Sequence, residues 1–271
     1  YQIIDQFSIS EIREIISNAL NKGYLLIPLM LLLSLTNWVL EAQRWKVIFS
    51  PTLKLIHAIK ATLVGLAFSL LLPRIAGETI GRYWYLKRGK KDIISTLTLT
   101  KIVMAIVTFC FGLLGLLYLR RQHIISFHYR TYIVLLFVLS SVLFLFRKQA
   151  ISLLKKYTTA SFIGQLKFSN LSRLFLLTTT RYFTFISQTV VVVYFLAIPV
   201  PILDTICCLM VIYLLRMTTL SVNTFFDIGV RFSTAIFMFQ TLGLITDINL
   251  LLSVFSCVWL LNIIIPSAIG A

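Results

Sequence analysis

Long stretches of apolar residues, separated by short polar or basic segments, dominate the pattern along the chain. In order they are Gly23–Leu40, Leu55–Leu72, Ile93–Leu119, Tyr132–Phe146, Leu171–Ile198, Ile202–Val222, Val230–Ile245 and Ile248–Ile265. A helix needs about 20 apolar residues, within a range of about 17–25, to cross the hydrocarbon layer. Most of these blocks are long enough, although Tyr132–Phe146 and Val230–Ile245 are short. The pattern predicts an all-α fold: a polytopic transmembrane helix bundle of about eight spans.

The polar start of the chain has a different periodicity. In "SISEIREIISNALNKG", Ser8 and Glu11 fit a capping box at a helix N-terminus. Ile9, Ile12 and Ile16 then recur at helical spacing on one face. We therefore expect residues 1–22 to form an amphipathic interfacial helix lying on the membrane, and residues 23–271 to form one transmembrane domain.

Composition supports a membrane protein and weakens other classes. Hydrophobic residues make up 59% of the chain and charged residues 13%, whereas soluble domains carry about 25% charged residues. The net charge of +16 gathers in short loops beside apolar blocks, where anionic lipids attract it. No separate basic helix is available for a nucleic acid. The cysteines lie inside apolar blocks without a metal-binding spacing, so we expect neither a cofactor nor a metal.

The basic loops also predict an orientation through the positive-inside rule. If every block crosses the membrane, the loop with Arg74, Lys87 and Lys90 faces the cytoplasm, while Lys46 and Lys54 face the other side. Both termini are then expected to be cytoplasmic.

The stretch "LLPRIAGETIGRYWYLKRGKK" combines a proline, two glycines and alternating charges at a block's edge. Pro73 suits the first turn of a helix. In a helix, Arg74, Glu78 and Arg82 would stack on one face at four-residue spacing. Gly77 and Gly81 would let another helix approach closely. We predict a short charged helix over residues 73–86, packed into the protein at the bilayer edge.

A related pattern follows the sixth block. In "NTFFDIGVRFSTAIF", Asp227 precedes Arg231 by four residues with a glycine between them, as Glu78 precedes Arg82. The two pairs suggest an internal duplication with both sites on the cytoplasmic side. We expect the pairs to line one cavity that binds a lipid headgroup. The alternative is a structural clamp that neutralises charges where helices meet.

Two further basic residues, Lys101 and Arg181, lie well inside apolar blocks. Intramembrane charges are functional candidates, although either side chain could reach the interface. The candidate substrate-binding residues are thus Arg74, Glu78, Arg82, Lys101, Arg181, Asp227 and Arg231. Aromatic residues at block edges, including Trp45, Tyr83 and Trp84, are interpreted as interfacial anchors.

These motifs resemble the transmembrane region of lysylphosphatidylglycerol synthases, a family also called flippase-like. "NWVLEAQRWKVIF" resembles the end of that family's first span, and "LLPRIAGETIGRYWYL" is similar to its P-x-x-x-G-E-x-x-x-R signature. "DIGVR" resembles a second signature, although Phe232 stands where many members carry glutamate or glycine. The resemblance implies a multi-span protein of the bacterial plasma membrane, here without the soluble aminoacyl-transferase domain.

The sequence leaves three candidate functions for this protein. The first is a translocator of a phospholipid or lipid-linked substrate, in which arginines bind phosphate and the acids orient them and hold a cationic portion. The second is a non-transporting accessory protein that binds anionic lipid or a partner protein. A membrane-embedded transferase or phosphatase fits less well, because its chemistry needs paired carboxylates, a histidine or a metal cluster. We therefore expect membrane lipids, anionic or phosphate-bearing, as partners and no enzyme activity. The sequence leaves open a protein partner or a homo-oligomer.

Overall fold

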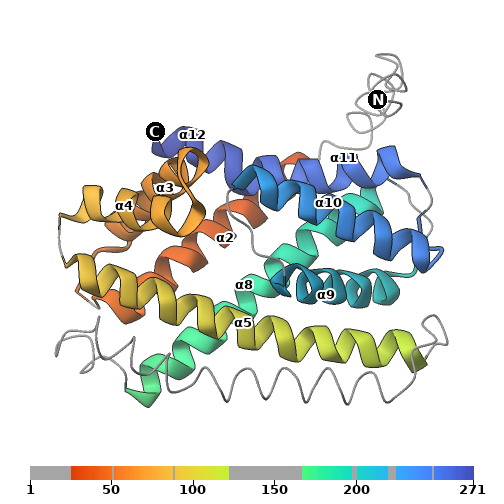
Figure 1. Cartoon of the computed structure of the whole chain (residues 1–271), viewed down its shortest axis with the longest axis horizontal. Coiled ribbons are helices and arrows are strands. Elements are labelled where there is room, and N and C mark those ends of the chain that lie inside the picture. The colour runs from red at the N-terminus through yellow and green to blue at the C-terminus, as the bar shows by residue number, and fades with distance from the viewer. Residues whose placement is uncertain are drawn as a thin grey trace.

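The computed structural model describes residues 26–50, 52–87, 89–121, 167–196, 200–218, 224–245 and 247–271. The helices are α2 (Leu26–Phe49), α3 (Leu55–Leu71), α4 (Arg74–Leu86), α5 (Lys90–Arg121), α8 (Phe168–Phe195), α9 (Ile202–Thr218), α10 (Thr224–Thr241), α11 (Ile248–Trp259), the π-helical turn η1 (Leu260–Ile264) and α12 (Ile265–Gly270). All regular structure in these ranges is helical (Figure 1). The predicted all-α transmembrane bundle is confirmed.

The helices follow the apolar blocks closely. Within the described ranges, each predicted span coincides with a helix, and α11, η1 and α12 together make the last one. Three of these helices are long and apolar enough to cross a membrane: Leu26–Phe49, Lys90–Arg121 and Ile248–Gly270. The predicted span Tyr132–Phe146 and the predicted interfacial helix over residues 1–22 lie outside the described residues.

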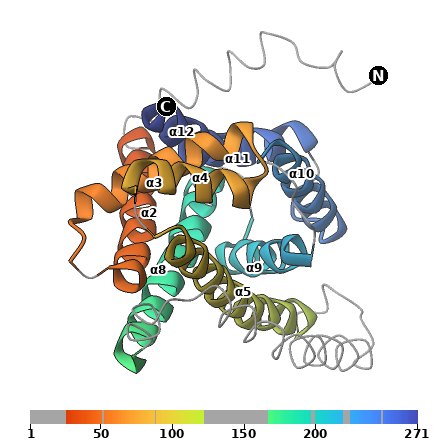
Figure 2. The same cartoon turned by 60° about the vertical axis from the view of Figure 1, so that its left-hand side comes forward.

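Helices α3 and α4 form a tight antiparallel hairpin that turns at Leu72 and Pro73 (Figure 2). A Cβ atom added to Gly77 would lie 2.5 Å from the Cα of Ser69 on α3, so the two backbones touch there. At the other end of the hairpin, a ring nitrogen of His57 lies 3.1 Å from the Tyr85 hydroxyl. The predicted helix and its close packing through glycine are confirmed.

The hairpin enters the bundle from one end and returns to that end. Phe49 at the end of α2, Lys54 before α3 and Leu86 at the end of α4 surround one shallow surface pocket. Because α5 begins at Lys90, it starts at the same end. The prediction that Lys54 and Lys90 lie on opposite sides is therefore wrong. The physical reason is that the chain reverses inside the bundle, at Pro73, instead of crossing it.

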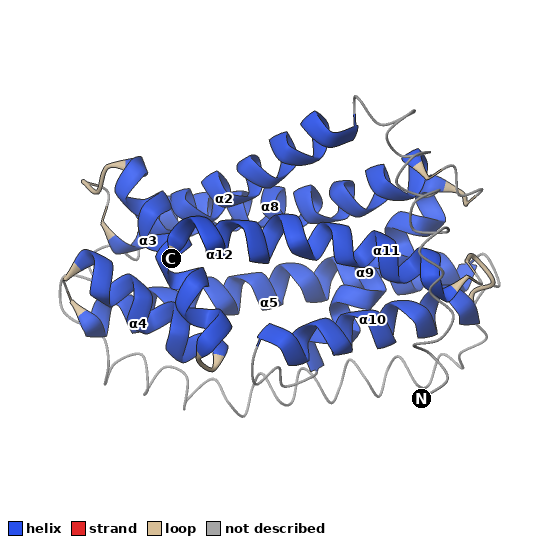
Figure 3. Ribbon diagram, turned by 90° about the horizontal axis from the view of Figure 1, so that it is seen from above, coloured by secondary structure: helices blue, strands red, loops and turns tan. Residues whose placement is uncertain are grey.

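A second hairpin, α9–α10, enters from the opposite end (Figure 3). Helix α9 runs antiparallel to α5, and a Cβ atom on Gly115, near the end of α5, would lie 2.8 Å from the carbonyl oxygen of Cys207, near the start of α9. Helix α10 returns beside α9, so the end of α9 and the start of α10 lie inside the bundle. Paired hairpins of opposite direction fit the predicted duplication. The expected placement of both charged sites at one membrane edge is corrected, since the hairpins meet midway.

Helices α2 and α8 form an antiparallel frame against which both hairpins pack. Ile48 near the end of α2 packs on Leu174 near the start of α8. Towards the other end, the Gln188 side chain donates a 2.9 Å hydrogen bond to the Ser34 hydroxyl. Helix α12 closes the bundle over α3, where the position of Gly270 leaves no room for a Cβ atom beside Leu63. These contacts leave a polar space between the two hairpin tips.

Candidate binding cavity

A cavity of about 340 Å³ lies between the hairpin tips and the frame helices. Ligand pockets in proteins typically measure about 300–1,000 Å³. Its lining comes from both hairpins, from α2, α5 and α8, and from the π-helical turn. Lys101, which lines it, lies about 17 Å along α5 from Lys90, given a rise of 1.5 Å per residue. The cavity is therefore well inside the length of a membrane-crossing helix.

The Glu41 carboxylate on α2 organises one side of the cavity. It pairs with Arg44 at 2.6 Å, with Arg82 of α4 at 3.3 Å and with Arg181 of α8 at 3.5 Å. Arg44 also donates a 2.9 Å hydrogen bond to the carbonyl oxygen of Thr100 on α5. One carboxylate thereby ties the first hairpin to two frame helices.

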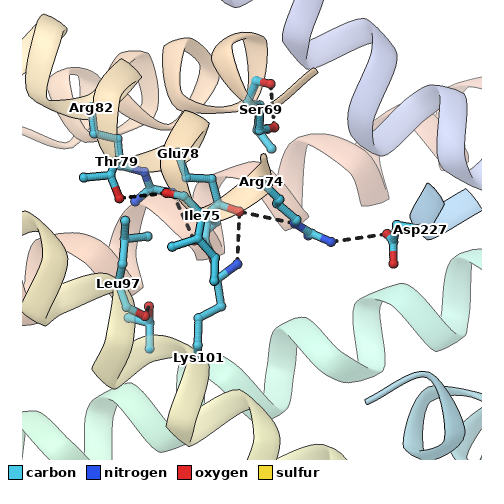
Figure 4. A network of polar contacts seen from close by, with 12 residues as sticks. Ser69, Arg74, Ile75, Glu78, Thr79, Arg82, Leu97, Lys101 and Asp227 are labelled. Atoms are coloured by element: carbon cyan, nitrogen blue, oxygen red, sulfur yellow. Dashed lines mark hydrogen bonds and ion pairs between the residues drawn. The ribbon is translucent and has the colours of Figure 1, made fainter. Parts of the chain in front are cut away.

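The Glu78 carboxylate on α4 organises the centre (Figure 4). It accepts a hydrogen bond from the Lys101 ammonium at 3.0 Å and pairs with Arg74 at 3.4 Å. The predicted pairing of Arg74 with Glu78 at four-residue spacing is confirmed. Arg82, one turn further along, turns instead to Glu41, so the predicted ladder divides between two carboxylates.

The Asp227 carboxylate at the start of α10 organises the third side. Arg216 near the end of α9 contacts both of its oxygens, at 2.7 and 2.8 Å. Arg231, four residues after Asp227, lies 3.1 Å away, which confirms the predicted local pair. Arg74 reaches across from the first hairpin to the same carboxylate at 3.2 Å. Asp227 itself is fully buried behind these arginines.

The cluster is strongly unbalanced in charge. Among the described residues it comprises the cations Arg44, Arg74, Arg82, Lys101, Arg181, Arg216 and Arg231 and the carboxylates Glu41, Glu78 and Asp227. With every group ionised, seven positive charges face three negative charges, a net charge of +4. Each carboxylate already contacts two or three of the cations, so the acids are fully engaged by the protein itself.

Arg82 has unused hydrogen-bonding capacity despite its burial. Its side chain is 2% exposed, and its guanidinium lies over the Trp45 ring with the Cζ atom 4.2 Å from the ring centroid. Its Nε and Nη1 atoms have no hydrogen-bond partner among the residues that the structure describes. Because unsatisfied buried donors cost about 1–3 kcal/mol, such atoms mark a place for an acceptor. Trp45 is 1% exposed, which corrects its interpretation as an interfacial anchor.

A chain of buried amides links α2, η1 and α8 beside the cavity. Asn37 of α2 donates to the Asn262 side-chain oxygen at 2.7 Å, and Asn262 donates to the Gln188 side-chain oxygen at 2.9 Å. Asn262 sits in the π-helical turn, and such turns often occur at functional sites. The chain fixes α2, α8 and the last span relative to one another, and Asn37 and Asn262 line the cavity.

All seven candidate residues from the sequence meet in this one cluster. Six of them line the cavity, and Asp227 lies directly behind Arg74, Arg216 and Arg231. Sequence reasoning missed Glu41, Arg44 and Arg216 as members of the cluster. Glu41 was detectable as a lone acid directly after the first apolar block. For Arg216, no local pattern indicates its partner.

Comparison with known proteins identifies the family of this chain. Residues 2–271 match the family described as Lysylphosphatidylglycerol synthase TM region. The chain belongs to this family. No curated protein and no solved structure matches it at a significant level.

The motifs that resemble this family supply several residues of the charged cluster and its surroundings. "QRW" contributes Arg44 and Trp45, the glycine-rich signature is helix α4, and "DIGVR" opens the part of α10 that holds Asp227 and Arg231. Phe232, the departure from the pattern, packs against the main hydrophobic core. Asp227 supplies the carboxylate of this second motif, since three arginines converge on it.

Proposed function

We propose that this protein binds the phosphate-bearing headgroup of a membrane lipid in the charged cavity and carries that headgroup across the bilayer. The observation that carries the proposal is the excess of arginine over carboxylate deep inside a membrane-spanning bundle. Intramembrane charges are costly and mark substrate paths when they face a cavity. An anionic headgroup is the ligand that such a lining favours.

The residue types suit phosphate. Arginine presents a planar fork of donors that binds two phosphate oxygens at once, whereas lysine acts as a point charge. Arg82 carries unsatisfied donors, and its plane is held against Trp45. In this proposal Glu41 and Glu78 orient the arginines. The expectation that the acids also hold a cationic portion of the ligand is not carried forward, because cations of the protein already surround them.

The two hairpins suggest a route for the headgroup from one side of the membrane to the other. They enter from opposite ends, and their tips meet at the contact of Arg74 with Asp227. Movement of one hairpin against the frame would open the cavity to one end while the other hairpin stays closed. Transporters built from oppositely directed repeats expose a central site to each side in turn by such movements. The acyl chains would remain in the surrounding lipid.

The proposed location is the plasma membrane of a bacterium, with the α4–α5 connection in the cytoplasm. The end of the bundle that carries this connection also carries Lys54, Lys87, Lys90 and Lys167. The described part of the opposite end carries Arg120 and Arg121 together with Asp204 and Asp247. The positive-inside rule therefore favours the lysine-rich end as cytoplasmic. Helix α12 ends towards this side, whereas α2 begins at the other (Figure 1).

The alternatives differ from this proposal in what happens after binding. A non-transporting accessory protein would use the same cavity but leave lipid in its original leaflet. The proposal assigns no reaction to the cavity, because carboxylates engaged by two or three cations are poor general bases. Translocation by the purified protein is therefore the property to measure.

The test uses purified protein in liposomes that contain a trace of fluorescent phosphatidylglycerol. The fluorescent label is attached to an acyl chain close to the headgroup. Dithionite added outside bleaches the outer leaflet, so further loss of fluorescence reports lipid that has crossed. Arg82→Lys keeps the charge but removes the planar fork, and we expect it to slow translocation by about ten-fold or more. Lys90→Gln, an exposed change at the bundle's end, is the matched control and should behave as wild type.

Thermal unfolding of each variant separates function from stability. Loss of translocation in an Arg82→Lys protein that unfolds at the wild-type temperature supports the proposal. Translocation by wild type no faster than in protein-free liposomes, despite specific lipid binding, favours the accessory function. If Arg82→Lys lowers the unfolding temperature but the folded protein moves lipid normally, the charged cluster is a structural clamp and the proposal fails.

A further inference from the structure

The charge imbalance of the cavity cannot be removed by changing the protonation of its own groups. Six of the seven cations are arginines, which stay protonated in proteins. If Lys101 alone lost its proton, the net charge would fall from +4 to +3. Protonation of a carboxylate would raise the net charge instead. The described cluster thus keeps at least three uncompensated positive charges whenever its carboxylates are ionised.

Other carboxylates in the described residues lie too far along the helices to balance this charge. Asp92 lies in the first turn of α5, Asp204 in the first turn of α9 and Asp247 at the N-cap of α11. These positions are at the ends of the bundle, whereas the cavity lies about 17 Å along α5. The acids Asp5, Glu11 and Glu14 belong to residues 1–25, outside the described part. An anionic ligand in the cavity would supply this balance.

The magnitude of the imbalance discriminates between headgroups. A phosphodiester such as that of phosphatidylglycerol brings a single negative charge. A headgroup that also carries ammonium groups has a net charge of zero or is positively charged. A phosphomonoester carries about −1.5 to −2 at pH 7 and has three strong acceptor oxygens. Charge interactions are strengthened inside a low-dielectric cavity, so each additional ligand charge has a large effect there.

The carboxylates offer no separate place for a ligand ammonium. Glu41 and Asp227 each contact three cations, and Glu78 contacts two. An added ammonium would compete with these cations and would be repelled by the remaining excess. Arg44, Arg82 and Arg181 carry buried donors that find no partner within the described ranges, and these donors need acceptor atoms instead. Both observations favour a ligand rich in acceptors and free of positive charge.

We propose that the preferred ligand is a lipid whose headgroup ends in a phosphomonoester or diphosphate and carries about two or more negative charges. This inference rests on the proposed function and narrows its substrate class. The expected affinity is highest for dianionic headgroups, lower for phosphodiesters, and lowest for zwitterionic or aminoacylated headgroups.

The first experiment measures binding of lipids that share the same acyl chains to the purified full-length protein in detergent micelles. The probes are phosphatidic acid (a monoester), phosphatidylglycerol (a diester), phosphatidylethanolamine and lysylphosphatidylglycerol, each titrated at pH 7.5 and followed by native mass spectrometry. We expect phosphatidic acid to bind about ten-fold tighter than phosphatidylglycerol, with the other two weaker still. Equal or tighter binding of phosphatidylglycerol or lysylphosphatidylglycerol would overturn the inference.

A second arm distinguishes a lipid from a soluble phosphate. Glycerol 3-phosphate and inorganic diphosphate are added as competitors against bound phosphatidic acid. We expect no displacement at equal concentration, because the soluble anions lack the acyl chains that hold a lipid in the protein–detergent micelle. Displacement at equal concentration would overturn the lipid assignment in favour of a free anion.

Variants connect the preference to the cavity. Arg181→Gln removes one positive charge and should reduce the ratio of phosphatidic acid to phosphatidylglycerol affinity, whereas Arg181→Lys should preserve most of it. Lys60→Gln, on an exposed face of α3 outside the cavity lining, should leave the ratio unchanged. A ratio unaffected by Arg181→Gln, or reduced equally by Lys60→Gln, would overturn the inference.

The outcomes for the two proposals are separable. If no anionic lipid binds or crosses and Arg82→Lys has no effect, the proposed function itself fails. If phosphatidylglycerol crosses in an Arg82-dependent way but binds as tightly as phosphatidic acid, the proposed function stands and the preference for a dianionic headgroup is wrong.

Discussion

Arg74 in the first turn of α4 and Asp227 in the first turn of α10 form an ion pair of 3.2 Å across 153 residues of sequence. Arg74 also pairs with Glu78 at 3.4 Å, so one guanidinium bridges carboxylates of both hairpins (Figure 4). The contact joins two segments that enter the bundle from opposite ends. It makes the position of each hairpin tip dependent on the other.

The Asp227→Asn change tests how much this ion pair contributes to the stability of the fold. It leaves Arg74, Arg216 and Arg231 without their shared carboxylate, and removing one partner of a buried ion pair costs about 3–5 kcal/mol. We expect a clearly lower midpoint of thermal unfolding in detergent, followed by intrinsic fluorescence. Asp204→Asn, in the first turn of α9 and away from the cavity, should leave the midpoint unchanged. Equal midpoints for the two variants would show that the junction contributes little to stability.

The contact of α3 with α4 predicts opposite effects for two glycine substitutions. A Cβ atom at Gly77 would lie 2.5 Å from backbone, so Gly77→Ala must push the helices apart and destabilise the protein by about 1–3 kcal/mol. At Gly229, inside α10, a Cβ atom would meet nothing within 4 Å. Gly229→Ala should therefore stabilise by up to about 1 kcal/mol through helix propensity. Thermal unfolding of both variants measures the difference, and a tolerated Gly77→Ala would contradict the close packing.

Chemical cross-linking tests whether α3 and α4 form a hairpin. His57 and Tyr85 lie at the same end of it, with their side chains 3.1 Å apart. In a chain whose four native cysteines are replaced by serine, a short bismaleimide should link His57→Cys to Tyr85→Cys. His57→Cys paired with Asp204→Cys, at the opposite end of the bundle, should not react. Failure of the first pair with good labelling of each cysteine alone would disprove the hairpin.

Thiol labelling of intact cells tests the proposed orientation in the same cysteine-free background. Lys54→Cys and Lys90→Cys lie at the lysine-rich end and should resist a membrane-impermeant maleimide until the cells are opened. Asp204→Cys should react in intact cells, because it lies at the other end. The reverse pattern would invert the orientation. Different behaviour of Lys54→Cys and Lys90→Cys would instead place a complete span between them.

The sequence predicts local relationships in this protein well. The i, i+4 pairs Arg74–Glu78 and Asp227–Arg231 form as expected, because helix geometry alone brings such side chains together. The role of Gly77 was also predictable, since glycines spaced by four residues indicate close helix packing. These predictions need no knowledge of depth or topology.

Long-range partners could not be predicted from the same patterns. Glu41 meets Arg82 because α4 returns towards the end of the bundle where α2 finishes. The apolar sequence of the 17-residue helix α3 is the same whether the chain crosses the membrane or turns back at Pro73. Treating α3 as a complete span placed Lys54 and Lys90 on opposite sides, and it left Glu41 without a visible partner. The direction of one short helix thus decided much of the site.

The charged hairpin also sets an order for biosynthesis. A lone arginine or aspartate at the centre of a helix costs about 2.5–3.5 kcal/mol during insertion at the translocon. Helix α4 carries Arg74, Glu78 and Arg82, and their partners come from α2, α5 and, for Arg74, from α10. While the ribosome is still translating the later helices, Arg74 has no Asp227 to meet. The Arg74–Asp227 pair can therefore form only after α10 has been translated, whereas Arg82 and Glu78 meet their partners on α2 and α5 earlier in synthesis.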